Sequence, residues 1–254
     1  VSLEGNTRNN DIWIGQLAGG RPVKIAGTER SEDRPRWSPD GKQLAFVSNR
    51  EGGPQVWVIP ASGGEARKLT SIATGASGIT WSPDGKWIAF VSEVFPACAD
   101  AACNERELKA RDESKVKAYL ADGLMFRHWT AWREGTYSHL FIMPADGSAA
   151  PRDLTPGASD VPPFSLGGPE DYAFSPDSKE IAFAKKTDKV EAISTNSDIF
   201  TIDITAPGAQ PKQVTTAPGA DGGPQYTPDG KYLAWRSQAR AGFEADRWVL
   251  NLLD

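Results

Sequence analysis

The sequence predicts an all-β fold built from repeated four-stranded antiparallel sheets, and three observations support this prediction. A turn of the form aromatic-Ser/Thr-Pro-Asp-Gly/Ser-Lys occurs four times, at Trp37, Trp81, Phe174 and Tyr226. Each turn leads into a short apolar run, such as LAFVS from Leu44. A second repeated pattern, in which a Gly-rich turn joins two strands, follows downstream.

The first repeated turn, WSPDGK, predicts a tight hairpin. Pro39 fixes its own φ near the value that the second turn position needs, Asp40 accepts backbone hydrogen bonds, and Gly41 tolerates a positive φ. The run from Leu44 to Val47 is apolar without alternation, which is typical of a strand covered on both faces. The hairpin therefore belongs inside a layered β structure.

The second pattern completes a unit of four strands. Its copies are QVWVIPASGGEARKLT from Gln55, HLFIMPADGSAAPRDLT from His139, DIFTIDITAPGAQPKQVT from Asp198, a copy from Asp11 without its upstream half, and DRWVLNLLD from Asp246. Four-stranded units that repeat in this way are the signature of a β-propeller, because one blade buries its faces only against neighbouring blades. We predict about five blades over residues 1–254: three complete, one leading half and one without its last strand.

Small residues beside large ones in the repeated strands predict how the blades pack. Alanine recurs at Ala45, Ala89, Ala182 and Ala234, each beside a larger apolar neighbour. We interpret these alanines, and the aromatic residue before each repeated turn, as interblade packing positions.

One blade carries an insertion. Successive turns are 44, 93 and 52 residues apart, so the second interval holds about 45 extra residues, assigned to 93–138. Residues 104–123 are expected to form a charged helix that ends at Gly123, and LMFRHWTAW from Leu124 is expected to be one alternating strand of a hairpin. In a four-stranded meander this insertion shares a rim with the loops after Lys185 and Ser237, which we take as the working surface.

Composition excludes several classes of function. Charged residues make up 24% and hydrophobic residues 39% of the chain, the net charge is −5, and Lys and Arg form no stripe. A nucleic-acid partner and a membrane span are therefore not expected. Cys98 and Cys103 are spaced for a small loop disulfide, which would indicate an oxidising compartment, or they are two free thiols.

The sequence contains no pattern for catalysis by this chain alone. The strings nearest to G-x-S-x-G begin at Gly75 and Gly157, and both lack the final glycine. His139 occupies a repeated strand position and is expected to be structural, whereas His128 is expected to pack in the inserted hairpin or to contact a ligand. Neither a metal site nor a cofactor is predicted.

The repeats resemble the β-propeller repeat of the TolB protein and of prolyl oligopeptidase family serine peptidases. Three longer strings resemble the N-terminal propeller of dipeptidyl peptidase 5 and acylaminoacyl peptidase-like members of that family: LMFRHWTAWREGTYSHLFIMPADG, DVPPFSLGGPEDYAFSPDSKEIAF and YTPDGKYLAWRSQARAGFEADRW. The resemblance implies a periplasmic or secreted serine exopeptidase. Its propeller would gate access of short peptides to an α/β-hydrolase domain that carries the catalytic triad and is absent from this chain.

Substrate contacts follow from the same resemblance. A dipeptidyl peptidase needs a carboxylate for the free α-amine of its substrate, and Glu244 is the first candidate, with Arg240 beside it and Glu170 in reserve. The alternative is an Arg240–Glu244 ion pair that only orders the loop. At the level of the whole chain, the alternatives are a non-enzymatic TolB-like periplasmic propeller that binds protein partners, and a carbohydrate-binding or lyase propeller.

Overall fold

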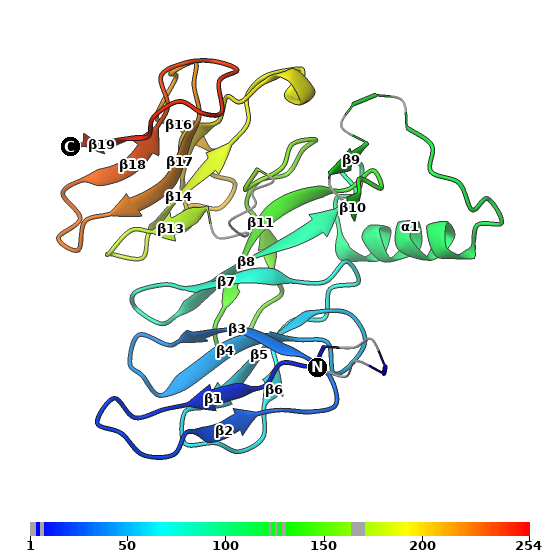
Figure 1. The fold of residues 1–254 in the computed structure, drawn as a ribbon, viewed down its shortest axis with the longest axis vertical. Coiled ribbons are helices and arrows are strands. Elements are labelled where there is room, and N and C mark those ends of the chain that lie inside the picture. Colours follow the sequence, from blue (N-terminus) through cyan, green and yellow to red (C-terminus); the bar gives the residue numbers. More distant parts are fainter. Residues whose placement is uncertain (1–3, 6–7, 122, 125, 129–130, 164–170) are drawn as a thin grey trace.

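The computed structural model describes residues 4–5, 8–121, 123–124, 126–128, 131–163 and 171–254. Its antiparallel sheets follow one another in chain order and form an open fan, with the N-terminal sheet at one end and the C-terminal sheet at the other (Figure 1). Three sheets are complete four-stranded meanders: β3 (Glu32–Trp37), β4 (Gln43–Ser48), β5 (Gln55–Pro60) and β6 (Arg67–Lys68); β7 (Ser77–Trp81), β8 (Trp87–Val94), β11 (Tyr137–Pro144) and β12 (Arg152–Asp153); β13 (Tyr172–Phe174), β14 (Glu180–Lys185), β15 (Asp198–Asp203) and β16 (Lys212–Gln213).

The sheet at each end of the fan is incomplete, so the fan stays open. At the N-terminal end β1 (Ile12–Ile14) pairs with β2 (Val23–Ala26), and at the C-terminal end β17 (Asp221–Tyr226), β18 (Leu233–Ser237) and β19 (Val249–Leu253) form a three-stranded sheet. The predicted fold class, an incomplete propeller with a leading half blade and a trailing blade that lacks its fourth strand, is confirmed.

The same pattern of hydrogen bonds recurs in each of the four repeated turns. In the first, Gly41 has a φ of 69°, and the Ser38 hydroxyl donates to an Asp40 carboxylate oxygen over 2.7 Å. The backbone amide of Lys42 donates to the same carboxylate oxygen, and that of Gln43 donates to the Ser38 hydroxyl. The Ser38 hydrogen bond is the main reason that the pKa of Asp40 lies below its ordinary value. The motif is therefore a structural element of each blade.

The core lies between neighbouring sheets, as the alanine pattern predicts. Ala45 is fully buried in a cluster with Ile79 and Phe90 of the next sheet, and Ala89 is fully buried against Phe174 and Phe183 of the sheet after that. A small side chain at these positions lets the large side chains of the adjacent sheet enter.

The aromatic residue before the repeated turn packs between blades in three of four cases. The Trp81 indole nitrogen donates to the Arg36 carbonyl of the preceding sheet over 3.1 Å, and the Tyr226 hydroxyl donates to Glu180. Phe174 is buried. For Trp37 the prediction is wrong, since its side chain is 50% exposed. Among the described residues the preceding sheet consists of β1 and β2 alone, which leaves Trp37 partly uncovered.

The insertion differs from the prediction in both of its elements. The helix α1 (Ala101–Glu113) begins three residues earlier and ends ten residues earlier than expected. The Asp100 carboxylate caps its N-terminus by accepting from the Cys103 amide over 2.7 Å. After it, the Ser114 hydroxyl accepts from the Val116 amide, a local hydrogen bond that competes with helix continuation.

The expected single strand after the helix is also wrong. β9 (Arg127–His128) and β10 (Ala131–Trp132) are two short strands that pair with each other. The chain then continues into β11, whose eight residues pair along the whole of β8.

Candidate functional site

Two rims of the fan differ in structure. We call the rim that carries the four repeated turns the turn rim, and the opposite rim, which carries the connections between second and third strands, the loop rim. Figure 1 shows α1 and the β9–β10 hairpin on the side opposite to the turns. The loops at residues 186–197 and 238–248 are the corresponding connections of the next two sheets. Because the insertion and these two loops are longer than the connections on the turn rim, the loop rim is the candidate functional site.

The loop at 238–248 has a fixed backbone. The buried Gln238 side chain donates to the carbonyls of Glu244 and Asp246, over 3.0 and 2.7 Å. Gly242, with a φ of 70°, donates its amide to the Thr195 hydroxyl of the neighbouring loop over 2.9 Å. The two loops are thereby tied into one surface.

Arg240 is paired with Asp246 rather than with Glu244, so the predicted Arg240–Glu244 ion pair is wrong. Its guanidinium lies 3.0 Å from an Asp246 carboxylate oxygen and 4.0 Å from the centre of the Phe243 ring. The hydrogen bond from Arg240 is the main cause that lowers the pKa of Asp246. The sequence analysis did not identify Asp246 as the partner of Arg240, because it assigned Asp246 only to the repeated strand pattern.

Glu244 itself is exposed, and its carboxylate has no hydrogen-bond or ion-pair partner among the described residues. Its main chain is held by Gln238, so the carboxylate is presented to solvent from a fixed backbone. Glu170, the reserve candidate, lies outside the described residues. The backbone of His128 lies in β9, and its side chain lies outside the described part of the structure.

His139 is a buried structural residue, as predicted. One ring nitrogen lies 2.7 Å from an Asp153 carboxylate oxygen and the other lies 2.8 Å from the Gly157 carbonyl. Burial lowers the pKa of His139, but the Asp153 hydrogen bond and charge outweigh burial, so that the net pKa is raised. These hydrogen bonds hold the first half of β11 against β12 and against the segment that leads to the next sheet.

The insertion is anchored at both ends. Cys98 and Cys103 form a disulfide at the start of α1, and the buried Asn104 side chain accepts from the Phe95 amide over 2.8 Å. At the other end, Arg133 forms an ion pair with Asp160, whose second oxygen accepts from the Ser138 amide. Asp160 was missed because no local pattern marks a contact across 27 residues.

Between these anchors lies a cavity of about 610 Å³, whose lining includes Arg111, Val116, Tyr119, Leu120, Phe126 and Trp132. The rings of Tyr119 and Trp132 are stacked with their centres 4.2 Å apart. The helix was predicted to include Tyr119, which instead turns into this aromatic cluster.

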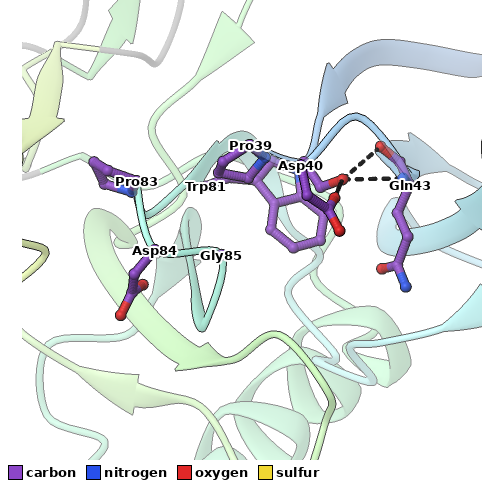
Figure 2. A pocket seen from close by; sticks show the side chains of 8 residues that line it. Pro39, Asp40, Gln43, Trp81, Pro83, Asp84 and Gly85 are labelled. Carbon is purple, nitrogen blue, oxygen red and sulfur yellow. Dashed lines mark hydrogen bonds between the residues drawn. The ribbon is translucent and has the colours of Figure 1, made fainter.

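A second cavity, of about 440 Å³, lies on the turn rim between the first two repeated turns. Hydrogen bonds through the Ser38 hydroxyl join Asp40 to Gln43, and Figure 2 shows these two residues among those that line the cavity. Because the polar groups of Asp40 are committed to the turn itself, this cavity is a product of the fold repeat.

Neither a metal cluster nor a membrane helix emerges from the described residues. They contain no group of three or more His, Cys, Asp or Glu side chains that would suit a metal ion. Within the same residues no helix has the length and hydropathy needed to cross a bilayer.

Comparisons with known proteins agree with this architecture. The family model of the Tricorn protease N-terminal beta propeller domain matches residues 7–169. The dipeptidyl-peptidase 5 of Porphyromonas gingivalis is 35% identical over 257 residues, which cover 99% of this chain and 36% of that protein. The chain thus spans about a third of the length of this relative, and the resemblance carried by the three longer strings is confirmed.

Solved structures show the same fold at low identity. The acylaminoacyl peptidase of Pyrococcus horikoshii has a TM-score of 0.66 at 15% identity, over 100% of this chain and 35% of that chain. TolB from Acinetobacter baumannii has a TM-score of 0.54 at 15% identity, over 95% of this chain and 45% of that chain.

Proposed function

The chain belongs to the family of the Tricorn protease N-terminal beta propeller domain, and on this basis we propose that it is the substrate-gating propeller of a serine exopeptidase that hydrolyses short peptides. The curated relative that matches nearly the whole chain is a dipeptidyl-peptidase, which supports a peptide substrate with a free N-terminus. The fold similarity to TolB gives no comparable support to a partner-binding role, because it rests on 15% identity.

The loop rim is the side on which a catalytic domain would sit. In a four-stranded meander the first strand begins and the fourth strand ends on the same rim, and here that is the loop rim. Any domain that flanks such a propeller in the chain connects at that rim. We therefore place an α/β-hydrolase domain with a Ser-Asp-His triad against the loops at 186–197 and 238–248.

Glu244 is the residue that we assign to the α-ammonium group of the substrate. Its carboxylate is exposed and unpaired among the described residues, while Gln238 fixes its carbonyl at 3.0 Å. A substrate α-ammonium supplies the missing positive charge, and a hydrolase domain above the rim would exclude water and strengthen the pair. Arg240, oriented by Asp246, presents guanidinium N–H donors that suit a substrate carbonyl.

The test uses the intact protein that contains this chain and a dipeptide amide substrate with a free N-terminus. The Glu244→Gln variant is expected to lose about 10- to 100-fold in kcat/KM, mainly through KM, since a charge-assisted hydrogen bond contributes about 1.5–3 kcal/mol. The N-acetylated form of the same substrate lacks the ammonium, so its kcat/KM is expected to stay unchanged.

Glu65, exposed on the turn rim, provides the matched control through Glu65→Gln, which is expected to have no effect on either substrate. Equal losses on the free and acetylated substrates, or no loss on either, would contradict the assignment of Glu244. A protein without peptidase activity would contradict the function itself.

We also propose a periplasmic or secreted location. The Cys98–Cys103 disulfide supports it, because such bonds persist in oxidising compartments.

A further inference from the structure

Asp221, the first residue of β17, has a buried carboxylate whose charge no neighbouring group in the described part of the chain compensates. Its side chain is 1% exposed, and neither carboxylate oxygen has a hydrogen-bond partner among the described residues. An unpaired carboxylate in such a place is strongly unfavourable, because its hydration is lost and no other interaction replaces it.

The corresponding residue of the first complete blade shows what is missing. Glu32 begins β3 and pairs with Ser48 across the sheet, as Asp221 begins β17 and pairs with Ser237. Glu32 is equally buried, but its carboxylate lies 3.0 Å from the Arg50 guanidinium and 2.9 Å from the Thr28 hydroxyl. A cation and a hydroxyl therefore neutralise this position in one blade.

Both donors are absent around Asp221. Arg50 follows Ser48 by two residues, and the residue two positions after Ser237 is Ala239. Thr28 precedes Glu32 by four residues, and the residue four positions before Asp221 is Ala217. Asp is also one methylene shorter than Glu. The blade thus has an uncompensated negative charge where its counterpart has an internal cation.

The start of the neighbouring strand β15 lies beside Asp221, because the Asp221 amide donates to the Ser197 carbonyl over 2.8 Å. Asp198, the first residue of β15, is 2% exposed, and its carboxylate accepts hydrogen bonds from Thr187, Thr215 and Gln213. The Asn196 side-chain carbonyl oxygen is buried without a hydrogen-bond partner among the described residues. The Asn196 amide donates to Thr187, which in turn donates to Asp198, so these groups form one network.

We propose that a calcium ion binds between Asp221 and Asp198, with the Asn196 carbonyl oxygen as a further ligand. Two carboxylates balance a divalent charge, and an all-oxygen donor set suits a hard cation, with water filling its remaining positions. The ion takes the role that Arg50 plays beside Glu32. It joins the third strand of one sheet to the first strand of the next, directly beneath the two loops of the loop rim.

The proposal is tested on the intact protein after removal of metal with EDTA and titration with Ca²⁺, read as the Tm and as bound calcium by elemental mass spectrometry. At Ca²⁺ about 100-fold above its Kd, the Tm is expected to rise by about 5 °C or more. Asp221→Asn is expected to bind one calcium ion fewer per chain and to lose this rise. Asp203→Asn, the same change at the far end of β15, is expected to keep both.

A second variant, Asn196→Ala, tests the proposal even if Asp221→Asn fails to fold. Asn196→Ala, at a partly buried position, is expected to weaken calcium affinity at least about tenfold. The proposal is overturned if the metal-free protein shows no Tm response to Ca²⁺, or if Asp221→Asn and Asn196→Ala retain the calcium content and affinity of the unmodified protein. Peptidase activity is not part of this readout, so the result stands apart from the proposed function.

Discussion

At the scale of single residues, charge pairing on the loop rim follows loop geometry rather than sequence spacing. Arg240 and Glu244 have the separation that would favour an ion pair on a helix, but the chain between them turns at Gly242. Asp246 instead accepts from the amides of Ala239 and Arg240 and from the Arg240 guanidinium. The sequence identified the loop and its exposed carboxylate, while the partner of Arg240 required the backbone path.

His139 gives a pH prediction at this scale. Since its folded pKa is raised above 6.5, its charged form contributes stability that is fully present below about pH 6.5 and is lost as pH rises through the folded pKa. Asp153→Asn removes the main favourable partner, so it is expected to lower the free energy of unfolding by about 1–3 kcal/mol at pH 5.5 and by less at pH 8.5. Urea denaturation at both pH values measures this difference.

Asp112→Asn, an exposed change on α1, is the control and is expected to show no such pH dependence. A larger loss for Asp153→Asn at pH 8.5 than at pH 5.5 would mean that His139 is neutral when folded.

Ser178 gives a second residue-scale prediction. It replaces the turn glycine of the third repeat with a φ of 60°, and its hydroxyl accepts from the Asp84 amide of the preceding sheet over 3.0 Å. Ser178→Ala keeps the strained φ and loses the hydrogen bond, with an expected cost of about 1–2 kcal/mol. Ser178→Gly loses the same bond but relieves the strain, so it is expected to cost less. Thermal unfolding of both variants ranks them, and the reverse order would contradict this explanation.

At the scale of elements, the strands were predictable and the insertion was only partly so. The repeated strands carry a pattern that recurs in every blade, so each copy supports the others. The helix had no such support: its start depends on the Asp100 cap, and its end on Ser114 and on the aromatic cluster that takes up Tyr119. The last of these is a tertiary contact that overrides helix propensity, which no local pattern encodes.

Asn104 tests how α1 is attached. Its side chain accepts from the Phe95 amide and donates to the Asp100 carbonyl, which joins the end of β8 to the first turn of the helix. Asn104→Ala is expected to speed hydrogen exchange of the Phe95 amide by about tenfold while the Tm changes by less than about 2 °C, because the opening is local. Asn49→Ala, at an exposed position, is the control. A loss of Tm with unchanged local exchange would show that Asn104 supports the whole fan instead.

At the scale of the whole molecule, one rule accounts for the fan: small residues at Ala45, Ala89 and Ala182 let each sheet receive the large side chains of the next. The ends of the fan follow from the same rule. Trp37 at one end and Leu250 in β19 at the other are 50% and 71% exposed, because within the described part of the chain no further complete sheet covers them. The repeat predicted this arrangement, whereas the contact between the starts of β15 and β17, where the Asp221 amide donates to the Ser197 carbonyl, became visible only in the structure.

The central claim is that this propeller belongs to a larger serine peptidase, and the most direct test is the intact mass of the natural protein, isolated from its source and sequenced by mass spectrometry. We predict a species far heavier than the 27.4 kDa of this chain, with peptides that run into a G-x-S-x-G segment. A natural species near 27.4 kDa, without such a segment, would contradict the peptidase assignment.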